Sequence, residues 1–131
     1  MARFAAVFIA LASVLSLATA TPIANNATLD KRASTHTGRG TWFNVGLGAC
    51  GYTDEDSDSI VALSTNIYDS GSHCNKWLTI KNKANGKTAK GQVRDACPGC
   101  SSNDIDMSPT LFKKLGSLDT GVLTVEWSYT S

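Results

Sequence analysis

The sequence predicts a small, mostly β domain that closes into a barrel. Short segments rich in β-branched and aromatic residues alternate with Gly, Asn, Asp and Ser, a composition typical of strands joined by turns. No helix recurs between successive strands, which excludes the parallel α/β folds. Several short strands with only one or two small helices favour a closed barrel.

Five segments have the composition or the alternation of strands. They are residues 40–45, 60–63, 77–80, 88–94 and 122–129. In the last segment Leu123, Val125 and Trp127 alternate with polar residues, which predicts one buried face. Between the third and fourth segments, Asn85-Gly86 predicts a tight hairpin because both residues tolerate a positive φ.

Two short helices complete the predicted elements. Residues 108–116 have Ser108 at the N-cap, Pro109 at the first helical position, lysines in the last turn and Gly116 at the end. Residues 64–69 are expected to form a shorter helical turn that ends before Gly71. Strands therefore outnumber helices, as a barrel requires.

The beginning of the chain has the features of a secretory leader. A basic residue and an apolar segment precede the small residues Ala18-Thr19-Ala20, so residues 1–20 are predicted to be a cleaved signal peptide. Residues 21–32 are polar and end in Lys31-Arg32, a dibasic pair that indicates a processed pro-segment. The apolar segment is too short for a transmembrane helix. Residues 33–131 are therefore expected to be one secreted, extracellular domain.

Charge and cysteine content narrow the function classes. The chain has 12 basic and 11 acidic residues, so no basic excess points to nucleic acid. An even number of cysteines in a small secreted domain predicts disulfides, here among Cys50, Cys74, Cys97 and Cys100, with three pairings open. The alternative is zinc, because Cys97 and Cys100 have the spacing of a zinc knuckle. The other two cysteines lack that spacing, which favours disulfides, no metal and no cofactor.

Several short motifs follow one another along the predicted domain. They are Gly40-Thr41-Trp42-Phe43, Gly48-Ala49-Cys50-Gly51-Tyr52, Ala62-Leu63-Ser64-Thr65, Gly71-Ser72-His73-Cys74, Ile105-Asp106-Met107-Ser108 and the last strand. The chain resembles expansins over nearly the whole mature domain, and its single-domain form is similar to fungal loosenins. The resemblance implies a six-stranded double-psi β-barrel of the RlpA-like class, shared with barwin-type proteins and family-45 endoglucanases. It also implies disulfides between Cys50 and Cys74 and between Cys97 and Cys100.

The same resemblance implies roles for two carboxylates. Asp106 stands where expansins have the Asp of their His-Phe-Asp motif, which in the related endoglucanases is the catalytic acid. Asp95 matches the Asp of the Asn-Asp-Arg motif of bacterial RlpA-type transglycosylases. The segment that provides the catalytic base of the endoglucanases reads Thr41, Phe43 and Val45 here, so the base is absent. Efficient inverting hydrolysis needs both groups, so the domain is expected to bind glycan without cutting it.

The resulting hypothesis is a monomeric, expansin-like protein that binds and loosens wall polysaccharide, with cellulose, chitin and a peptidoglycan-like glycan as candidate partners. No membrane or nucleic acid is expected to take part. The predicted polysaccharide-binding residues are Thr41, Trp42, Phe43, Asn44, Tyr52 and Trp77. Two alternatives remain open, namely a lytic glycosidase or transglycosylase that uses Asp106 and Asp95, and an inhibitor of papain-like proteases or a host-targeted effector.

Overall fold

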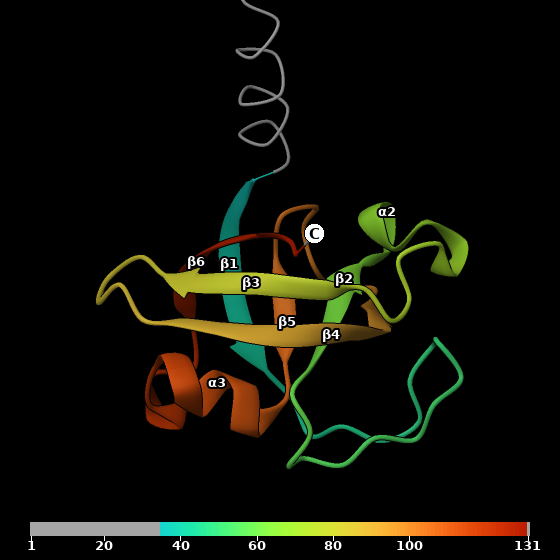
Figure 1. Cartoon of the computed structure of the whole chain (residues 1–131), viewed down its shortest axis with the longest axis horizontal. Helices are drawn as coiled ribbons and strands as arrows, with labels where there is room; N and C mark the ends of the chain where they lie inside the picture. Colours follow the sequence, from blue (N-terminus) through green and yellow to red (C-terminus); the bar gives the residue numbers. More distant parts are fainter. Residues whose placement is uncertain (1–34, 131) are drawn as a thin grey trace, which may run out of the picture.

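The computed structural model describes residues 35–130, which form a closed six-stranded barrel (Figure 1). The strands are β1 His36–Trp42, β2 Ile60–Ser64, β3 Trp77–Asn82, β4 Thr88–Cys97, β5 Ile105–Met107 and β6 Leu123–Tyr129. Around the barrel they follow the order β1-β5-β2-β4-β3-β6. The predicted six-stranded, mostly β barrel is therefore confirmed. The predicted signal peptide and pro-segment, residues 1–32, lie outside the described residues.

The barrel combines parallel and antiparallel strand pairs. The pairs β1 with β5 and β2 with β4 are parallel, and the other neighbours are antiparallel. Parallel neighbours cannot be joined by a tight hairpin, so long connections separate them in the sequence. The short strand β5 consequently lies between β1 and β2, which both precede it by many residues (Figure 1).

The core fills the barrel interior and one of its ends. Alternate residues of the strands point inward, and the predicted buried face of β6 is confirmed by Leu123, Val125 and Trp127. Helix α3, Pro109–Leu115, packs Leu111, Phe112 and Leu115 against the same core. In Figure 1 this helix lies at one end of the barrel, below β4. The strand faces that point away from the core remain available for a site.

The helices occur where they were predicted, with one difference in how α3 begins. Helix α2, Thr65–Tyr68, starts after Ser64, whose hydroxyl accepts a hydrogen bond from Asn66 N. The 3₁₀ turn η1, Asp69–Gly71, follows α2 directly, and a second 3₁₀ turn, η2 Leu118–Thr120, follows α3. Ser108 precedes α3 but makes no side-chain cap; its Oγ accepts a bond from Ile60 N instead, because Ser108 is fully buried against β2. No helix in residues 35–130 is long and apolar enough to span a membrane.

Several strand ends differ from the sequence expectation by one to four residues. Strand β1 begins at His36 rather than at residue 40, because His36 already pairs with Trp127 of β6. The hairpin between β3 and β4 is confirmed, but residues 83–87 make its turn longer than expected, and only Gly86 of the Asn85-Gly86 pair has a positive φ. The Asn85 amide donates to Leu115 O at 3.0 Å, so it ties the hairpin to α3.

Candidate functional site

Four neighbouring strands each bring one side chain into a row across the barrel. Thr41 of β1 pairs with Asp106 of β5. Ala62 of β2 pairs with Asp106 on one side and with Asp95 of β4 on the other. Adjacent strands are about 4.8 Å apart, so the Cα atoms of the two aspartates are about 10 Å apart. Thr41, Asp106, Ala62 and Asp95 are called the groove row below.

Asp106 is the half-buried carboxylate of the groove row. Its neighbours Ile105 and Met107 point into the core, so Asp106 points outward. Thr41 Oγ1 donates a hydrogen bond of 3.0 Å to Asp106 Oδ1. Burial raises the pKa of Asp106 above its usual value and the charge of Asp95 adds to this, while the bonds from Thr41 and the Met107 backbone oppose it. Asp106 therefore keeps its proton to a higher pH than an ordinary aspartate.

The raised pKa has a consequence for stability. A carboxyl whose pKa is higher in the folded chain than the usual 3.8 stabilises the fold most below that pH, and this contribution is lost as the pH rises through the folded pKa. Asp106→Asn has no charge to bury, so we expect it to melt at a higher temperature than the wild type at neutral pH. The difference should shrink toward a pH of about 3. Thermal unfolding at both pH values tests this, and a lower melting temperature of the variant at neutral pH would contradict it.

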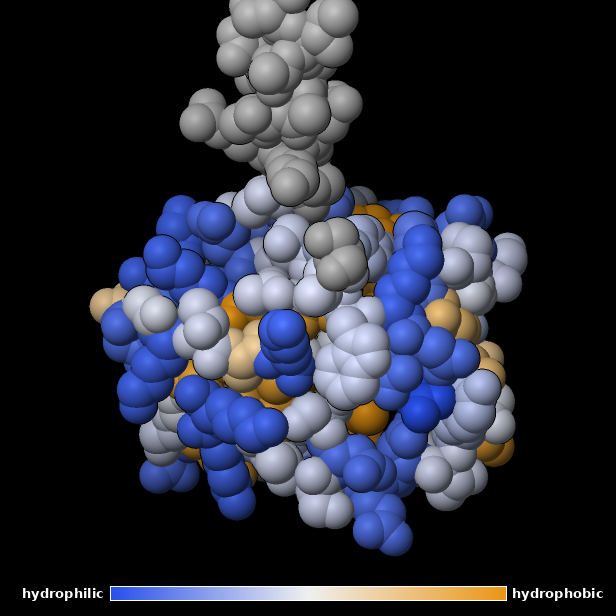
Figure 2. Space-filling view, viewed as in Figure 1, coloured by the Kyte–Doolittle hydropathy of each residue, from blue (hydrophilic) through white to orange (hydrophobic). Residues whose placement is uncertain are grey.

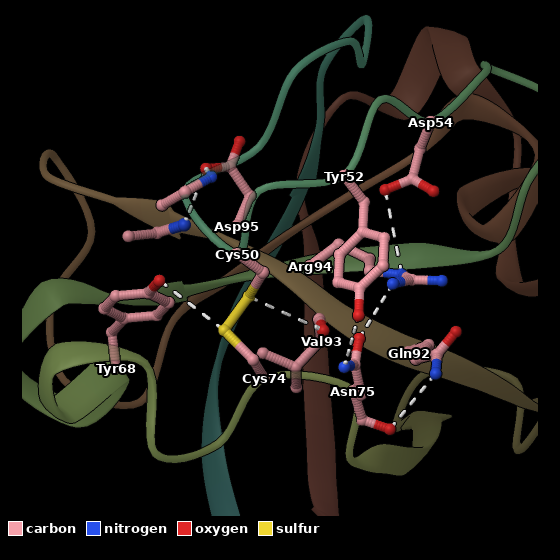
Figure 3. The surroundings of a disulfide bond; sticks show 12 residues. Cys50, Tyr52, Asp54, Tyr68, Cys74, Asn75, Gln92, Val93, Arg94 and Asp95 are labelled. Carbon is pink, nitrogen blue, oxygen red and sulfur yellow. Dashed lines mark hydrogen bonds and ion pairs between the residues drawn. A yellow bond between two sulfur atoms is a disulfide. The ribbon is translucent and has the colours of Figure 1, made fainter.

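Asp95 faces the groove row because strand β4 contains a bulge. Val61 pairs with Val93 but Ala62 pairs with Asp95, so Arg94 is an extra residue in the ladder. Strict alternation would have turned Asp95 toward the core together with Val93. Asp95 Oδ1 instead accepts bonds of 2.8 Å from Ala49 N and from its neighbour Ala96 N (Figure 3). Asp95 thus fastens the loop of residues 43–59, called the 43–59 loop, to the barrel.

A small pocket of about 210 Å³ opens at the Asp106 end of the groove row. Its lining combines polar side chains with one disulfide and consists of Arg39, Thr41, Cys97, Gly99, Cys100, Asp104 and Asp106. Asp104 accepts backbone bonds from Arg39 N at 2.8 Å and Ser101 N at 3.3 Å, so both its oxygens are used to hold the loop. Asp106 is therefore the carboxylate of this pocket that is left to meet a ligand.

Trp42, Phe43 and Asn44 lie next to Thr41 in the sequence but have other partners. Trp42 packs against the core, and its indole N–H donates to Leu118 O at 3.1 Å. Phe43 is partly buried, and its backbone N–H donates to Met107 O. The Asn44 amide donates to Asp56 Oδ2 at 2.9 Å. Bonds from the Val45 backbone and from Asn44 lower the pKa of Asp56, which keeps this brace of the 43–59 loop ionised.

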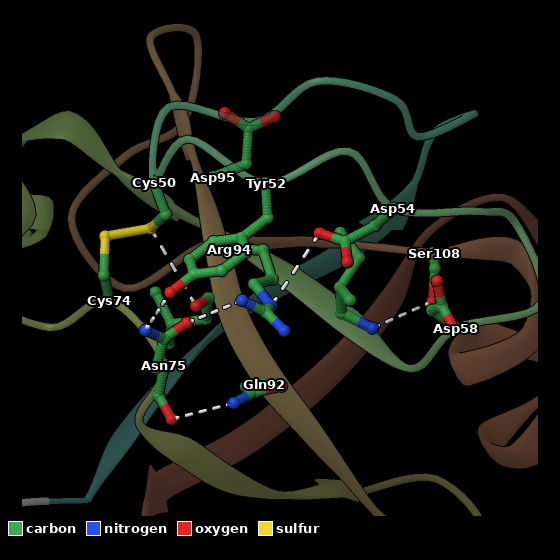
Figure 4. Close-up of polar contacts among 12 residues, drawn as sticks. Cys50, Tyr52, Asp54, Asp58, Cys74, Asn75, Gln92, Arg94, Asp95 and Ser108 are labelled. Carbon is green, nitrogen blue, oxygen red and sulfur yellow. Dashed lines mark hydrogen bonds and ion pairs between the residues drawn. A yellow bond between two sulfur atoms is a disulfide. The ribbon is translucent and has the colours of Figure 1, made fainter.

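Tyr52 belongs to a polar cluster that braces the other end of the 43–59 loop (Figure 4). The Arg94 guanidinium lies over the Tyr52 ring, 3.9 Å from its centre. Arg94 Nη1 donates to Asn75 Oδ1 at 2.8 Å, and Asn75 Nδ2 donates to the Tyr52 hydroxyl at 3.2 Å. Arg94 Nε also lies 3.8 Å from Asp54 Oδ2, an ion pair too long to be a hydrogen bond. The bulge residue Arg94 thus joins the loop to the barrel.

The predicted cysteine pairing is confirmed by both disulfides of the described chain. Cys50 is bonded to Cys74, which connects the 43–59 loop to the segment before β3 (Figure 3). Cys97 is bonded to Cys100 and lines the pocket beside Asp106. No free cysteine remains in residues 35–130, which removes the zinc alternative for these four side chains.

The tip of the 43–59 loop presents an exposed apolar side chain on a fixed backbone. Leu47 is 76% exposed, more than any other large hydrophobic residue of the described chain. Its flanking glycines are held, since Gly48 N donates to Tyr52 O at 2.9 Å and Gly46 O accepts from Asp54 N at 3.0 Å. Leu47 itself forms an isolated bridge with Thr53. A rigid loop therefore holds Leu47 out in solvent.

One protein family matches most of the chain. The kiwellin family, described as Kiwellin-1, matches residues 17–130. The chain belongs to the kiwellin family. This kiwellin-family chain is 33% identical over 100 residues to the papain inhibitor of Streptomyces mobaraensis, a match that covers 71% of the chain and 70% of the inhibitor. The chain spans between 28% and 70% of the length of the first curated relatives that it matches.

Two solved structures share the barrel. One is a variant of the Clavibacter michiganensis expansin in complex with cellohexaose, with a TM-score of 0.67, 25% identity and coverage of 74% of this chain and 50% of the expansin. The other is the Streptomyces papain inhibitor, with a TM-score of 0.65, 29% identity and coverage of 74% of this chain and 94% of the inhibitor. The expected resemblance to expansins is confirmed for this kiwellin-family barrel.

Trp77 lies away from the groove row of this kiwellin-family barrel. It is the first residue of β3, and three steps around the barrel separate β3 from β5 in either direction. Asp106 and Trp77 are therefore on opposite sides. Arg39 was missed by the sequence analysis although it lines the Asp106 pocket. Arg39 and Thr41 are alternate residues of β1, and this alternation could have predicted Arg39 as a site residue. The sequence analysis missed it because β1 begins earlier than expected.

The described chain offers no evident place for a metal ion. In residues 35–130, no group of three or more His, Cys, Asp or Glu side chains is arranged to hold one. Asp95 and Asp104 bond backbone N–H groups and Asp106 bonds Thr41. Asp106 and Thr41 therefore present hydrogen-bonding groups to a ligand in the pocket.

Proposed function

We propose that this kiwellin-family protein is secreted, binds β-linked wall polysaccharide along the groove row and separates neighbouring glycan chains without cutting them. The observation that carries the proposal is Asp106, half-buried, bonded to Thr41 and aimed into a pocket on the outer face of the barrel. The expansin that shares this barrel was crystallised with cellohexaose, which supports a glucan as the ligand. The disulfides support a secreted protein.

The mechanism is competition for hydrogen bonds. When protonated, Asp106 donates a hydrogen bond to a hydroxyl or to the glycosidic oxygen of one chain, and when ionised it accepts a hydrogen bond from a hydroxyl. Thr41 holds the Asp106 carboxyl in place through its hydroxyl. Each bond exchanged between two chains and the protein is worth about 1 kcal/mol net, so several weak contacts suffice to displace a chain locally.

Hydrolysis of the glycan is the alternative function, because the groove row contains two carboxylates. An inverting hydrolase needs an acid and a carboxylate base about 6.5–9.5 Å apart, with a water molecule between the base and the sugar. Asp95 is the carboxylate across the row from Asp106. By the family resemblance, Val45 stands where the endoglucanases have their base. Because Asp95 Oδ1 already accepts two backbone bonds, we assign Asp95 to anchoring the loop rather than to activating water.

The test compares Asp106→Asn with a matched control. Asp119→Asn removes an exposed carboxylate from η2, away from the pocket lining. In pull-down with cellulose, chitin, xylan and peptidoglycan, we expect Asp106→Asn to weaken binding to the preferred glycan about tenfold, the loss of one bond to a charged group. Asp119→Asn should bind as the wild type does, and none of the proteins should release reducing ends.

Two results would overturn this function. Binding and wall weakening that survive in Asp106→Asn would remove the groove row from the mechanism. Release of reducing ends that is lost in both Asp106→Asn and Asp95→Asn would show a lytic enzyme instead. Thermal unfolding of Asp106→Asn at neutral pH shows whether a loss of binding by this variant comes from unfolding.

A second function, inhibition of papain-like cysteine proteases, is favoured by the exposed Leu47. Inhibitors bind tightly when the contacting loop is already fixed in its bound shape, and the 43–59 loop meets that condition. The structural match to the Streptomyces papain inhibitor also covers 94% of the inhibitor chain. Leu47 would enter an apolar pocket of the protease cleft.

Titration of papain with the protein tests this second function. We expect Leu47→Ala to raise the inhibition constant at least about tenfold, as truncation of a central apolar contact does. Val122→Ala is the matched control, because Val122 is a large hydrophobic residue that is 45% exposed outside the 43–59 loop. Full papain activity in excess wild-type protein would exclude the inhibitor function. Equal inhibition by Leu47→Ala and the wild type would show that papain contacts other residues instead of Leu47.

A further inference from the structure

We propose that the outer face of β3 and β4 around Trp77 is a second binding site, for a carboxylated polysaccharide such as polygalacturonate. The proposal goes beyond binding of a neutral glucan by the groove row and does not depend on it. Trp77 lies on β3, on the side of the barrel opposite Asp106.

Trp77 differs from the other tryptophans in what it contacts. Trp42 and Trp127 donate their indole N–H groups to the carbonyls of Leu118 and Asn103, and both pack in or against the core. Trp77 is 44% exposed, and in the described part of the chain its indole N–H has no protein partner. An exposed ring and a free donor are both available to a ligand.

The surroundings of Trp77 form an open depression of about 640 Å³. It is lined by Asn75, Lys76, Trp77, Lys90 and Thr130, with no carboxylate among them. The Asn75 amide and the Thr130 hydroxyl already bond Tyr52, Arg94 and Thr79. The aromatic ring and the two lysines are therefore what the depression offers to a ligand.

Neither lysine is neutralised by an acidic side chain. The one ion pair in residues 35–130 joins Arg94 to Asp54. Lys76 Nζ lies 3.3 Å from His73 Nδ1 and 5.5 Å from the centre of the Tyr129 ring, so it is held in place by uncharged groups. Lys90 is exposed and extends from β4. Figure 2, which views the face of β3 and β4, shows hydrophilic side chains around a paler and partly apolar centre.

This combination fits an acidic sugar better than a neutral one. The C–H face of a pyranose ring stacks on an exposed aromatic ring, and the indole N–H can bond a sugar oxygen. Carboxylates along the chain would pair with Lys76 and Lys90 in charge-assisted bonds. The depression is open to solvent, so a polymer chain can reach Trp77 and both lysines from outside.

Affinity electrophoresis in gels that contain polygalacturonate tests the proposal, with fully methyl-esterified pectin and neutral glucan as comparison ligands. We expect retardation by polygalacturonate, and dissociation constants at least about tenfold weaker for the esterified polymer and at high salt, where surface charges are screened. Trp77→Ala should weaken binding about tenfold and Lys90→Gln about threefold. Trp77→Phe keeps the ring and should retain most of the affinity.

The controls separate this site from the groove row and from general attraction. Lys113→Gln removes an exposed lysine from α3, and Asp106→Asn alters the groove row; both should bind polygalacturonate as the wild type does. Unchanged binding by Trp77→Ala, or equal binding of the esterified polymer, would overturn the proposal. So would binding of dextran sulfate or single-stranded DNA as tight as that of polygalacturonate, which would indicate attraction of any polyanion.

Discussion

Replacement of both Cys50 and Cys74 by alanine is expected to lower the free energy of unfolding by about 3 kcal/mol. The bond joins residues 24 positions apart, and closing a loop of that length restricts the unfolded chain by about this amount. In the folded state it also links the 43–59 loop to the segment before β3. Urea unfolding of the double variant measures the loss through the shift of its midpoint.

The second disulfide provides the control for this expectation. Cys97 and Cys100 are only 3 positions apart, so their replacement by alanine should cost about half as much. A larger loss of unfolding free energy from this pair would show that the Cys97–Cys100 bond mainly holds the pocket lining in place. The Cys50–Cys74 variant should also inhibit papain less well, because the loop that presents Leu47 loses a brace.

The parts of the fold with strong local signals could be predicted from the sequence. Leu123, Val125 and Trp127 alternate because one face of β6 is buried, and Pro109 marks the start of α3. Strand β5 has only residues 105–107, too few for a periodic pattern. A sixth strand was predicted from the expansin resemblance alone. Its position between β1 and β2 depends on pairing with residues far away in the sequence.

The candidate site was harder to predict because its geometry depends on packing between strands. The bulge at Arg94 turns Asp95 from the core side to the outer face, and no local pattern in residues 88–94 indicates an extra residue. Trp42 and Trp77 are both tryptophans beside polar residues. The structure packs one against the core and exposes the other on the far side of the barrel from Asp106. Residue type alone could not distinguish these two environments.

Gly48→Ala is expected to destabilise the protein by about 1–3 kcal/mol, the usual cost of overpacking. A Cβ at position 48 would lie 2.3 Å from Arg94 O, which is backbone and cannot rotate away. It would also lie 3.3 Å from the Asp95 Cβ, so the loop must lift from the carboxylate that anchors it. Urea unfolding should show the loss, and papain inhibition should weaken because Leu47 is no longer fixed.

Gly46→Ala is the matched control for Gly48→Ala on the other side of Leu47. A Cβ at Gly46 meets no atom within 4 Å, so this variant should be as stable and as inhibitory as the wild type. Equal behaviour of the two variants would mean that contact with Arg94 O does not hold the loop. If Gly48→Ala lowers stability and papain inhibition but leaves glucan binding intact, the groove row binds glucan without help from the 43–59 loop. If glucan binding falls as well, the anchored loop is part of the groove, and the two proposed functions share one structural support.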